Sequence, residues 1–110
     1  MATVYKNGQV QGTAGVTTYA TLYNTGAATT AVISTILITN TAATSATYRI
    51  AIMGSAGTPS AANWLVYDST IAGNDTIALT LGITLGNTQF IRVSSSATTV
   101  TFTAFVSEIS

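Results

Sequence analysis

The side chains able to do chemistry in this chain are few, and their types are restrictive. There is no histidine and no cysteine, so the commonest general base, the commonest metal ligand and all disulfide chemistry are missing. The charged residues are Lys6, Arg49, Asp68, Asp75, Arg92 and Glu108. They sum to a net charge of zero, so no basic footprint suggests nucleic acid or an anionic membrane as a partner.

A catalytic centre is not expected from these residues. A serine or threonine nucleophile would need Lys6 or a carboxylate to activate it, and Lys6 lies in a polar, glycine-flanked segment typical of exposed positions. Hydrolysis by paired carboxylates needs two carboxyls about 5–10 Å apart beside a cleft. Asp68 and Asp75 are the one nearby pair in the sequence, and both fall at predicted strand ends. We therefore expect no enzyme and no cofactor.

Asp68, Asn74 and Asp75 also raise the question of a calcium site. Calcium takes six to eight oxygen ligands, and loop motifs that supply them are denser in aspartate. The simpler interpretation is that Asp68 ends one strand and that Asn74-Asp75 cap a turn into the next. We favour the turn and expect no metal.

Arg49 and Arg92 alternate with apolar neighbours, so each should face solvent or another subunit. One interpretation gives them a cross-strand partner such as Glu108 or Asp75. The other gives them an ion pair between subunits, because arginine is enriched at interfaces. The sequence leaves both open.

Large aromatic residues could form a carbohydrate-binding platform. They are Trp64, Tyr5, Tyr19, Tyr23, Tyr48 and Tyr67. These residues are dispersed along the chain, and large aromatics in a small sandwich usually fill the core with their polar tips at the rim. We expect core positions for most of them.

The elements that must position these residues are β-strands. Apolar residues recur with period two in Thr47–Ile52 and Val100–Val106, while Ala31–Ile38 is apolar on both faces and predicts a central strand, covered or at an interface. Turn signals such as Asn7-Gly8, Gly73-Asn74-Asp75 and Gly86-Asn87 recur about every ten residues, and Gly86-Asn87 predicts a hairpin. The fold class expected is all-β: a single-domain antiparallel β-sandwich, jelly-roll or Ig-like, of seven to eight strands.

The segment Thr76–Leu85 predicts a strand with an unusual outer face. Its odd positions, from Ile77 to Leu85, are large aliphatics that should face the core, and its even positions are only threonine, alanine and glycine. Only 5% of the chain is charged, against about 25% in a typical domain. We interpret the uncharged strip as a surface that lies against another subunit. The predicted interface residues are Thr76, Ala78, Thr80, Thr84, Arg49, Arg92 and Trp64.

The chain is divided into residues 1–16, an N-terminal arm or first strand, and residues 17–110, the sandwich domain. The first residues lack the apolar core of a signal peptide, and no segment approaches the ~18 apolar residues of a membrane span. We therefore expect no membrane partner. The arm, rich in glycine, glutamine and threonine, is expected to pair with an adjacent subunit.

Several stretches together resemble small all-β virion structural proteins of tailed bacteriophages. They are Thr21–Tyr23, Ala31–Ile38, Asn40–Ser45 leading into Ala46–Ile52, Tyr67–Gly82 and Phe102–Ile109. Within this class, the chain resembles capsid decoration (cement) proteins and small neck or tail appendage subunits. The resemblance implies a virion protein assembled in the host cytoplasm, and no ligand or active site.

From these observations we expect a homo-oligomer, a trimer, that binds the major capsid protein or other virion proteins. Capsid decoration is the first hypothesis. The alternatives are a tail, neck or fibre-associated structural subunit, and a receptor- or glycan-binding module.

Overall fold

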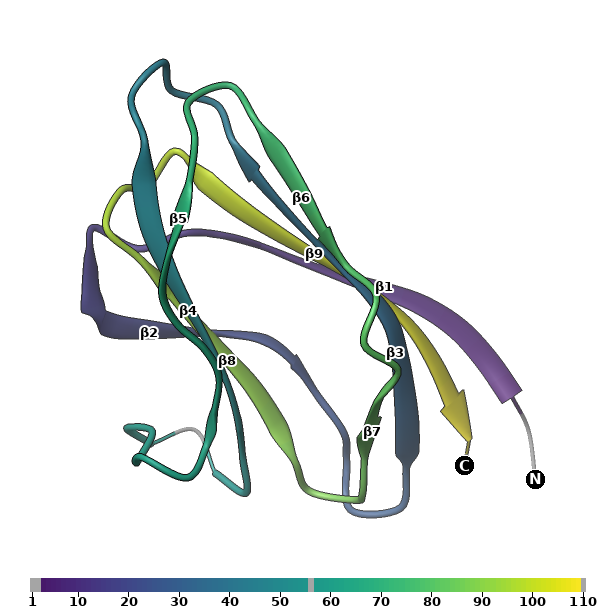
Figure 1. Cartoon of the computed structure of the whole chain (residues 1–110). Helices are drawn as coiled ribbons and strands as arrows, with labels where there is room; N and C mark the ends of the chain where they lie inside the picture. Colours follow the sequence, from purple (N-terminus) through teal and green to yellow (C-terminus); the bar gives the residue numbers. More distant parts are fainter. Residues whose placement is uncertain (1–2, 56, 110) are drawn as a thin grey trace.

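The chain folds as two packed antiparallel sheets, seen in a computed structural model that describes residues 3–55 and 57–109 (Figure 1). The strands of these residues are β1 (Thr3–Gln11), β2 (Gly15–Asn24), β3 (Thr30–Asn40), β4 (Ala46–Met53), β5 (Trp64–Ile71), β6 (Thr76–Leu79), β7 (Ile83–Leu85), β8 (Phe90–Ser95) and β9 (Val100–Ile109). The predicted single-domain, all-β antiparallel sandwich is confirmed. Met1 and Ala2 of the predicted arm, and Ser110 at the end of the predicted sandwich domain, lie outside the described residues. Ala56, in the segment of the sequence between Met53 and Trp64, does too.

The strand order identifies the topology. Sheet A has the order β1-β9-β3-β6, with β7 also paired to β3, and sheet B has the order β2-β8-β4-β5. Since β6 and β7 pair with the same strand one after the other, they are one interrupted strand. Counted so, the two sheets have the strand order of an eight-stranded jelly roll. The immunoglobulin-like alternative is therefore wrong, and the count of nine exceeds the predicted seven to eight because of this interruption.

The interruption lies in the segment that was predicted to be one continuous strand. Leu79 is opposite Ile36 and Ile83 is opposite Ile33, so three residues, 80–82, face the two residues of β3 at 34–35. Gly82 takes a positive φ of 62°, which glycine adopts without steric cost. The prediction that every odd position faces the core therefore fails at Leu81, whose side chain is 53% exposed.

Gly86-Asn87 does not form the predicted hairpin. The segment leads from β7 in sheet A to β8 in sheet B. Thr25, in the β2–β3 connection, holds the segment: its hydroxyl donates a hydrogen bond to Gly86 O and accepts one from Gln89 N. The chain crosses because β8 buries Ile91 and other apolar side chains between β2 and β4. Burial of the strand outweighed the local turn signal.

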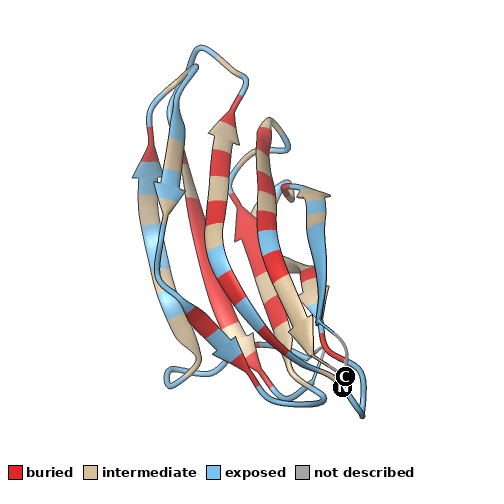
Figure 2. Ribbon diagram, turned by 90° about the vertical axis from the view of Figure 1, so that its right-hand side faces the viewer, coloured by how far each residue is buried: buried red, intermediate tan, exposed pale blue. Residues whose placement is uncertain are grey.

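The core lies between the two sheets, and buried positions alternate with accessible ones along the strands (Figure 2). Its largest members are Ile33, Ile36, Ile38, Tyr48, Ile50, Ile71, Leu85, Ile91, Val93, Val100 and Phe102. The rings of Tyr48 and Phe102 meet edge to face with centroids 6.3 Å apart. The period-two prediction for Val100–Val106 is confirmed. In Thr47–Ile52 the predicted residues Tyr48, Ile50 and Ile52 do contact the core, but burial does not alternate, because every residue from Tyr48 to Ala51 is buried.

β1 contains the Asn7-Gly8 pair that was predicted to be a turn. The strand instead pairs with β9 in unbroken register from Thr3 to Gln11. Gly8 is required for a different reason: a Cβ there would lie 2.6 Å from the backbone oxygen of Leu22 in β2. A glycine inside a strand often marks such a close approach of another backbone.

Candidate functional site

The outer face of sheet A is a broad surface without charge. Residues opposite one another in antiparallel strands share a face, so the register defines the surface, here called the uncharged face. It comprises Tyr5, Asn7, Gln9 and Gln11 of β1; Thr101, Thr103, Phe105 and Ser107 of β9; Val32, Thr35, Leu37 and Thr39 of β3; and Thr76, Ala78 and Thr84 of β6 and β7. None of these side chains is ionisable near neutral pH.

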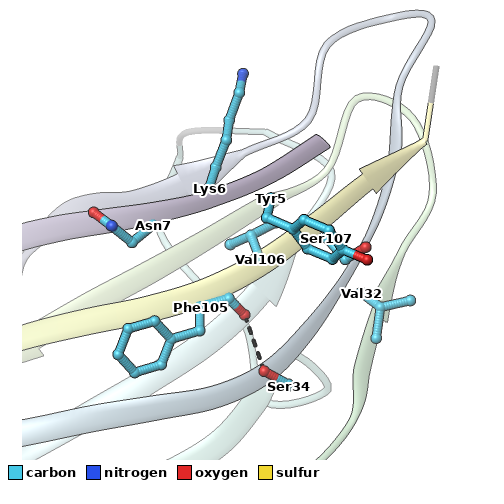
Figure 3. A pocket seen from close by; sticks show the side chains of 8 residues that line it. All are labelled: Tyr5, Lys6, Asn7, Val32, Ser34, Phe105, Val106 and Ser107. Atoms are coloured by element: carbon cyan, nitrogen blue, oxygen red, sulfur yellow. Dashed lines mark hydrogen bonds between the residues drawn. The ribbon is translucent and has the colours of Figure 1, made fainter. Parts of the chain in front are cut away.

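Aromatic and aliphatic groups are concentrated at one end of the uncharged face. Tyr5 is 83% exposed, Val32 40% and Phe105 42%. They border a shallow groove of about 440 Å³ across β1, β9 and β3, and Figure 3 shows Lys6 pointing away from it. Ser34, at a bulge of β3, donates a hydrogen bond to the backbone oxygen of Phe105 (3.5 Å). Apart from Lys6, whose side chain points away (Figure 3), the residues that line the groove are apolar or neutral and polar.

The predicted interface residues do not form one surface. Thr76, Ala78 and Thr84 lie on the uncharged face, while Thr80 lies in the break between β6 and β7. The other three predicted residues lie on the opposite sheet, sheet B: Arg49, Trp64 and Arg92.

Four prominent members of the uncharged face were not predicted. They are Tyr5, Val32, Leu37 and Phe105. The alternation of Val100–Val106 places Phe105 on the face opposite to Phe102, so the sequence did carry a signal for it. The apolar outer positions of β3 carried another. Ala31–Ile38 was predicted to be either covered on both faces or part of an interface. The chain itself does not cover both faces, because Val32 is exposed.

On sheet B, Arg49 is ion-paired within its own chain. Its Nε and Nη2 donate to the two carboxylate oxygens of Asp68 at 2.6 and 3.1 Å. Asp68 does not end a strand as predicted: it lies inside β5 at an irregularity, with a φ of 52°. The cross-strand pair was anticipated, but the partners proposed, Glu108 and Asp75, were wrong. The hydrogen bond to Asp68 raises the pKa of Arg49, and the same bond lowers the pKa of Asp68.

Three aromatic rings surround this ion pair. The guanidinium carbon of Arg49 lies 4.1 Å from the centroid of the Tyr67 ring and 5.4 Å from that of Trp64. Trp64 contacts Tyr19 and Tyr67, with centroids 6.0 and 5.0 Å apart. Together with Pro59 and Ala61 these residues line a depression of about 450 Å³, the Trp64 cleft.

The Trp64 cleft corrects the expectation that most large aromatics fill the core. Tyr48 is buried as expected, but Tyr67 is 57% exposed and Tyr5 83%. Tyr19 and Trp64 are intermediate. β2 and β5 are both edge strands, and Arg49 on β4 reaches toward each of them by bonding Tyr19 Oη and Asp68. The aromatics gather around that arginine.

Arg92 is held differently. Its Nη1 donates to Thr21 Oγ1 at 2.7 Å and its Nη2 to the backbone oxygen of Tyr19 at 3.4 Å. Across residues 3–55 and 57–109 it makes no ion pair, and its buried Nε has no hydrogen-bond partner. Neither carboxylate proposed for it lies within reach.

The residues considered for calcium have separate roles. Asp68 binds Arg49, whereas Asp75 accepts a hydrogen bond from the Thr76 N–H (2.9 Å) at the start of β6. Asn74, with a φ of 54°, occupies the turn, so the predicted turn is confirmed. Within the described parts of the chain, no three acidic, histidine or cysteine residues are grouped as a metal site would require. The same parts contain no helix of the length and hydropathy that crossing a membrane requires.

The remaining ion pair ties the two sheets together near the chain ends. Lys6 Nζ lies 3.0 Å from Glu108 Oε1, and the Tyr23 hydroxyl of β2 donates to the other carboxylate oxygen. These hydrogen bonds, Tyr23 first and then Lys6, lower the pKa of Glu108. The pKa of Tyr23 is raised, mainly by burial and to a smaller extent by the hydrogen bond to Glu108. The cluster is a structural latch between β1, β9 and β2.

Thermal stability should fall on acidification. The pKa values of Glu108 and Asp68 are lower in the folded chain than their ordinary values of 4.5 and 3.8. The unfolded chain therefore takes up protons first, so the stabilisation is complete above about pH 4.5 and is lost as the pH falls through the folded values. Circular dichroism melts between about pH 7 and about pH 3 measure this loss.

A variant separates the latch from general acid sensitivity. Glu108→Gln should flatten part of the acid-induced fall in melting temperature, because it removes one of the responsible carboxyls. Asp75→Asn removes a carboxylate outside both ion pairs and is the charge-matched control. An equal flattening in both variants would contradict the role given to Glu108.

No protein-family model and no curated protein sequence matches the chain.

Proposed function

We propose that this chain is a virion structural subunit that assembles through the uncharged face, with capsid decoration as its first role. The observation that carries the proposal is the breadth of that face: all five strands of sheet A contribute side chains to it, and none of these side chains is charged. The outer side of a sheet that faces water is normally polar and charged. The resemblance of the sequence to phage virion proteins supports the same proposal.

The chemistry of the uncharged face suits a protein interface. Interface cores are depleted in charged residues and enriched in tyrosine and phenylalanine, as Tyr5 and Phe105 illustrate here. Most of the other positions are threonine, serine or alanine, whose short side chains lose little conformational entropy when they become ordered. A flat surface of this kind can be covered at small entropic cost.

The free edge of β1 adds a second means of association. Its nine residues pair with β9 without a register shift, and its other edge has no paired strand among the described residues. The other sheet edges are interrupted: β2 and β5 by register shifts, and the β6–β7 edge by its break. A long regular edge is a template for pairing with another chain, so β1 would pair with a strand of a neighbouring subunit.

The partners proposed are further copies of this chain, as a trimer, and the major capsid protein or other virion proteins. Jelly rolls occur in viral shell proteins and in lectins, which is an analogy of fold and does not by itself assign a function. Decoration proteins stabilise a shell by mass action, because they bind the assembled lattice better than free subunits.

Copy number in purified particles tests the role. A decoration protein should be present in hundreds of copies per particle, which quantitative mass spectrometry against a labelled standard measures. A copy number equal to one or a few symmetric rings would overturn decoration in favour of a tail, neck or fibre-associated subunit. Absence from particles would overturn a virion role altogether.

A further inference from the structure

We propose that the Trp64 cleft binds a neutral saccharide unit. The cleft lies on sheet B, on the opposite side of the sandwich from the uncharged face. The inference is independent of the assembly role proposed above, since it rests on different residues. Its failure would leave that role untouched.

The shape and lining of the cleft fit one ring-sized ligand. Its volume of about 450 Å³ lies in the range of small-ligand pockets, and it is an open depression on the surface. Aromatic rings from β2 and β5 line it, together with the buried Pro59. Tyr67 is 57% exposed, so part of its ring is available for stacking. Exposed rings of this kind offer a platform to the C–H face of a pyranose.

The electrostatics favour a ligand without charge. Arg49 is neutralised by two hydrogen bonds to Asp68 and already lies over the Tyr67 ring at 4.1 Å. A cationic ligand would have to displace Arg49 from that ring, and an anionic one would have to displace Asp68 from Arg49. The first exchange gives up the cation–π contact of Arg49, and the second gives up its bidentate, charge-assisted pair with Asp68. A neutral ligand leaves the pair intact.

The polar groups of the cleft favour a hydroxylated ligand over an apolar one. Within residues 3–55 and 57–109, neither the Tyr67 hydroxyl nor the Trp64 indole N–H makes a hydrogen bond to the chain. Asp68 keeps free lone pairs on an exposed carboxylate, because its side chain is 41% exposed. The cleft therefore offers the Tyr67 hydroxyl and the Trp64 N–H among its lining residues, and the Asp68 carboxylate lies beside it on Arg49. A saccharide presents hydroxyls at its edge and C–H groups on its face, which matches this arrangement.

A polyproline peptide is the competing occupant, because aromatic grooves also bind such helices. Those sites extend along several residues of an elongated ligand, whereas the Trp64 cleft is one short depression. The saccharide is therefore favoured, and the peptide becomes an outcome of the experiment.

Trp64 is the only tryptophan of the chain, so its fluorescence reports directly on the cleft. The probes are methyl β-glucopyranoside, methyl β-galactopyranoside, N-acetylglucosamine, sialyllactose as a charged sugar and a capped hexaproline. We expect a saturable change with at least one neutral sugar at a Kd of about 1 mM or below, and a response at least tenfold weaker to sialyllactose and hexaproline. Tyr67→Ala should weaken binding about tenfold or more.

Two further variants keep the test decisive. Tyr67→Phe retains the ring and removes only the hydroxyl, so it should bind more weakly than the unaltered chain but clearly more tightly than Tyr67→Ala, which distinguishes loss of the platform from misfolding. Tyr5→Ala removes an exposed tyrosine from the uncharged face and should leave binding unchanged. The proposal is overturned if no neutral sugar binds, if Tyr67→Ala binds as well as the unaltered chain, or if hexaproline binds more tightly than every sugar.

Discussion

Alanine in place of Phe102 should lower the free energy of unfolding by about 3–5 kcal/mol, the range measured for buried phenylalanines. The side chain of Phe102 is fully buried and meets Tyr48 edge to face across the core. It sits in β9, between β1 and β3, where Val10 and Ile38 are its neighbours in register. The cavity left by its removal would lie in the core beneath β9, a strand paired on both sides, so the neighbouring strands have little freedom to collapse.

Phe105, in the same strand, provides a matched control. It lies on the uncharged face and is 42% exposed, so Phe105→Ala should change the unfolding free energy by no more than about 1 kcal/mol. Urea unfolding at protein concentrations where the chain is dissociated measures both variants. Equal losses for Phe102→Ala and Phe105→Ala would contradict the assignment of the two faces of β9.

The opposite behaviour of these phenylalanines follows from period two, which was visible in the sequence. The same pattern placed Tyr48, Ile50 and Ile52 on one face of β4. Alternation identifies the two faces of a regular strand, so the class of fold and much of the core could be predicted from it.

Irregularities in the strands could not be predicted from the same pattern. β3 has one extra residue, Ser34, relative to β9, and the β6–β7 edge places three residues, 80–82, opposite two of β3, so Leu81 turns outward. A bulge depends on how two strands distant in sequence fit together. The hairpin predicted at Gly86-Asn87 did not form for a related reason. Burial of the apolar side chains of β8, and not the turn residues, decides which sheet β8 joins.

The Trp64 cleft was the least predictable part of the molecule. Tyr19 and Trp64 are far apart in sequence, and they meet because Arg49 on β4 reaches toward both edge strands of sheet B. The positive φ of Asp68, inside β5, places its carboxylate against that arginine. Neither the strand irregularity nor the ring cluster leaves a local signal in the sequence. The uncharged strip, in contrast, was detectable, since Thr76, Ala78 and Thr84 share one face by simple alternation.

A lysine at Thr103 should abolish association through the uncharged face while leaving the fold intact. Thr103 lies in β9 between Gln9 of β1 and Leu37 of β3, so its substituent would project from the middle of that face. In a free subunit the ammonium would remain in water. In an assembly it would be buried opposite neutral groups without a partner, at a cost of several kcal/mol. We expect association to weaken at least about 100-fold, equivalent to roughly 3 kcal/mol.

Thr47→Lys is the matched control, because Thr47 has the same intermediate exposure in a strand of sheet B. Sedimentation velocity over a concentration series, with and without purified particles, compares both variants with the unaltered chain, and denaturant unfolding verifies that each still folds. Weakened association of Thr103→Lys with normal association of Thr47→Lys would support the uncharged face as the interface. If both variants associate normally, or if the unaltered chain stays monomeric at high concentration and does not bind particles, the interface lies elsewhere or does not exist. The uncharged threonines would then be ordinary surface.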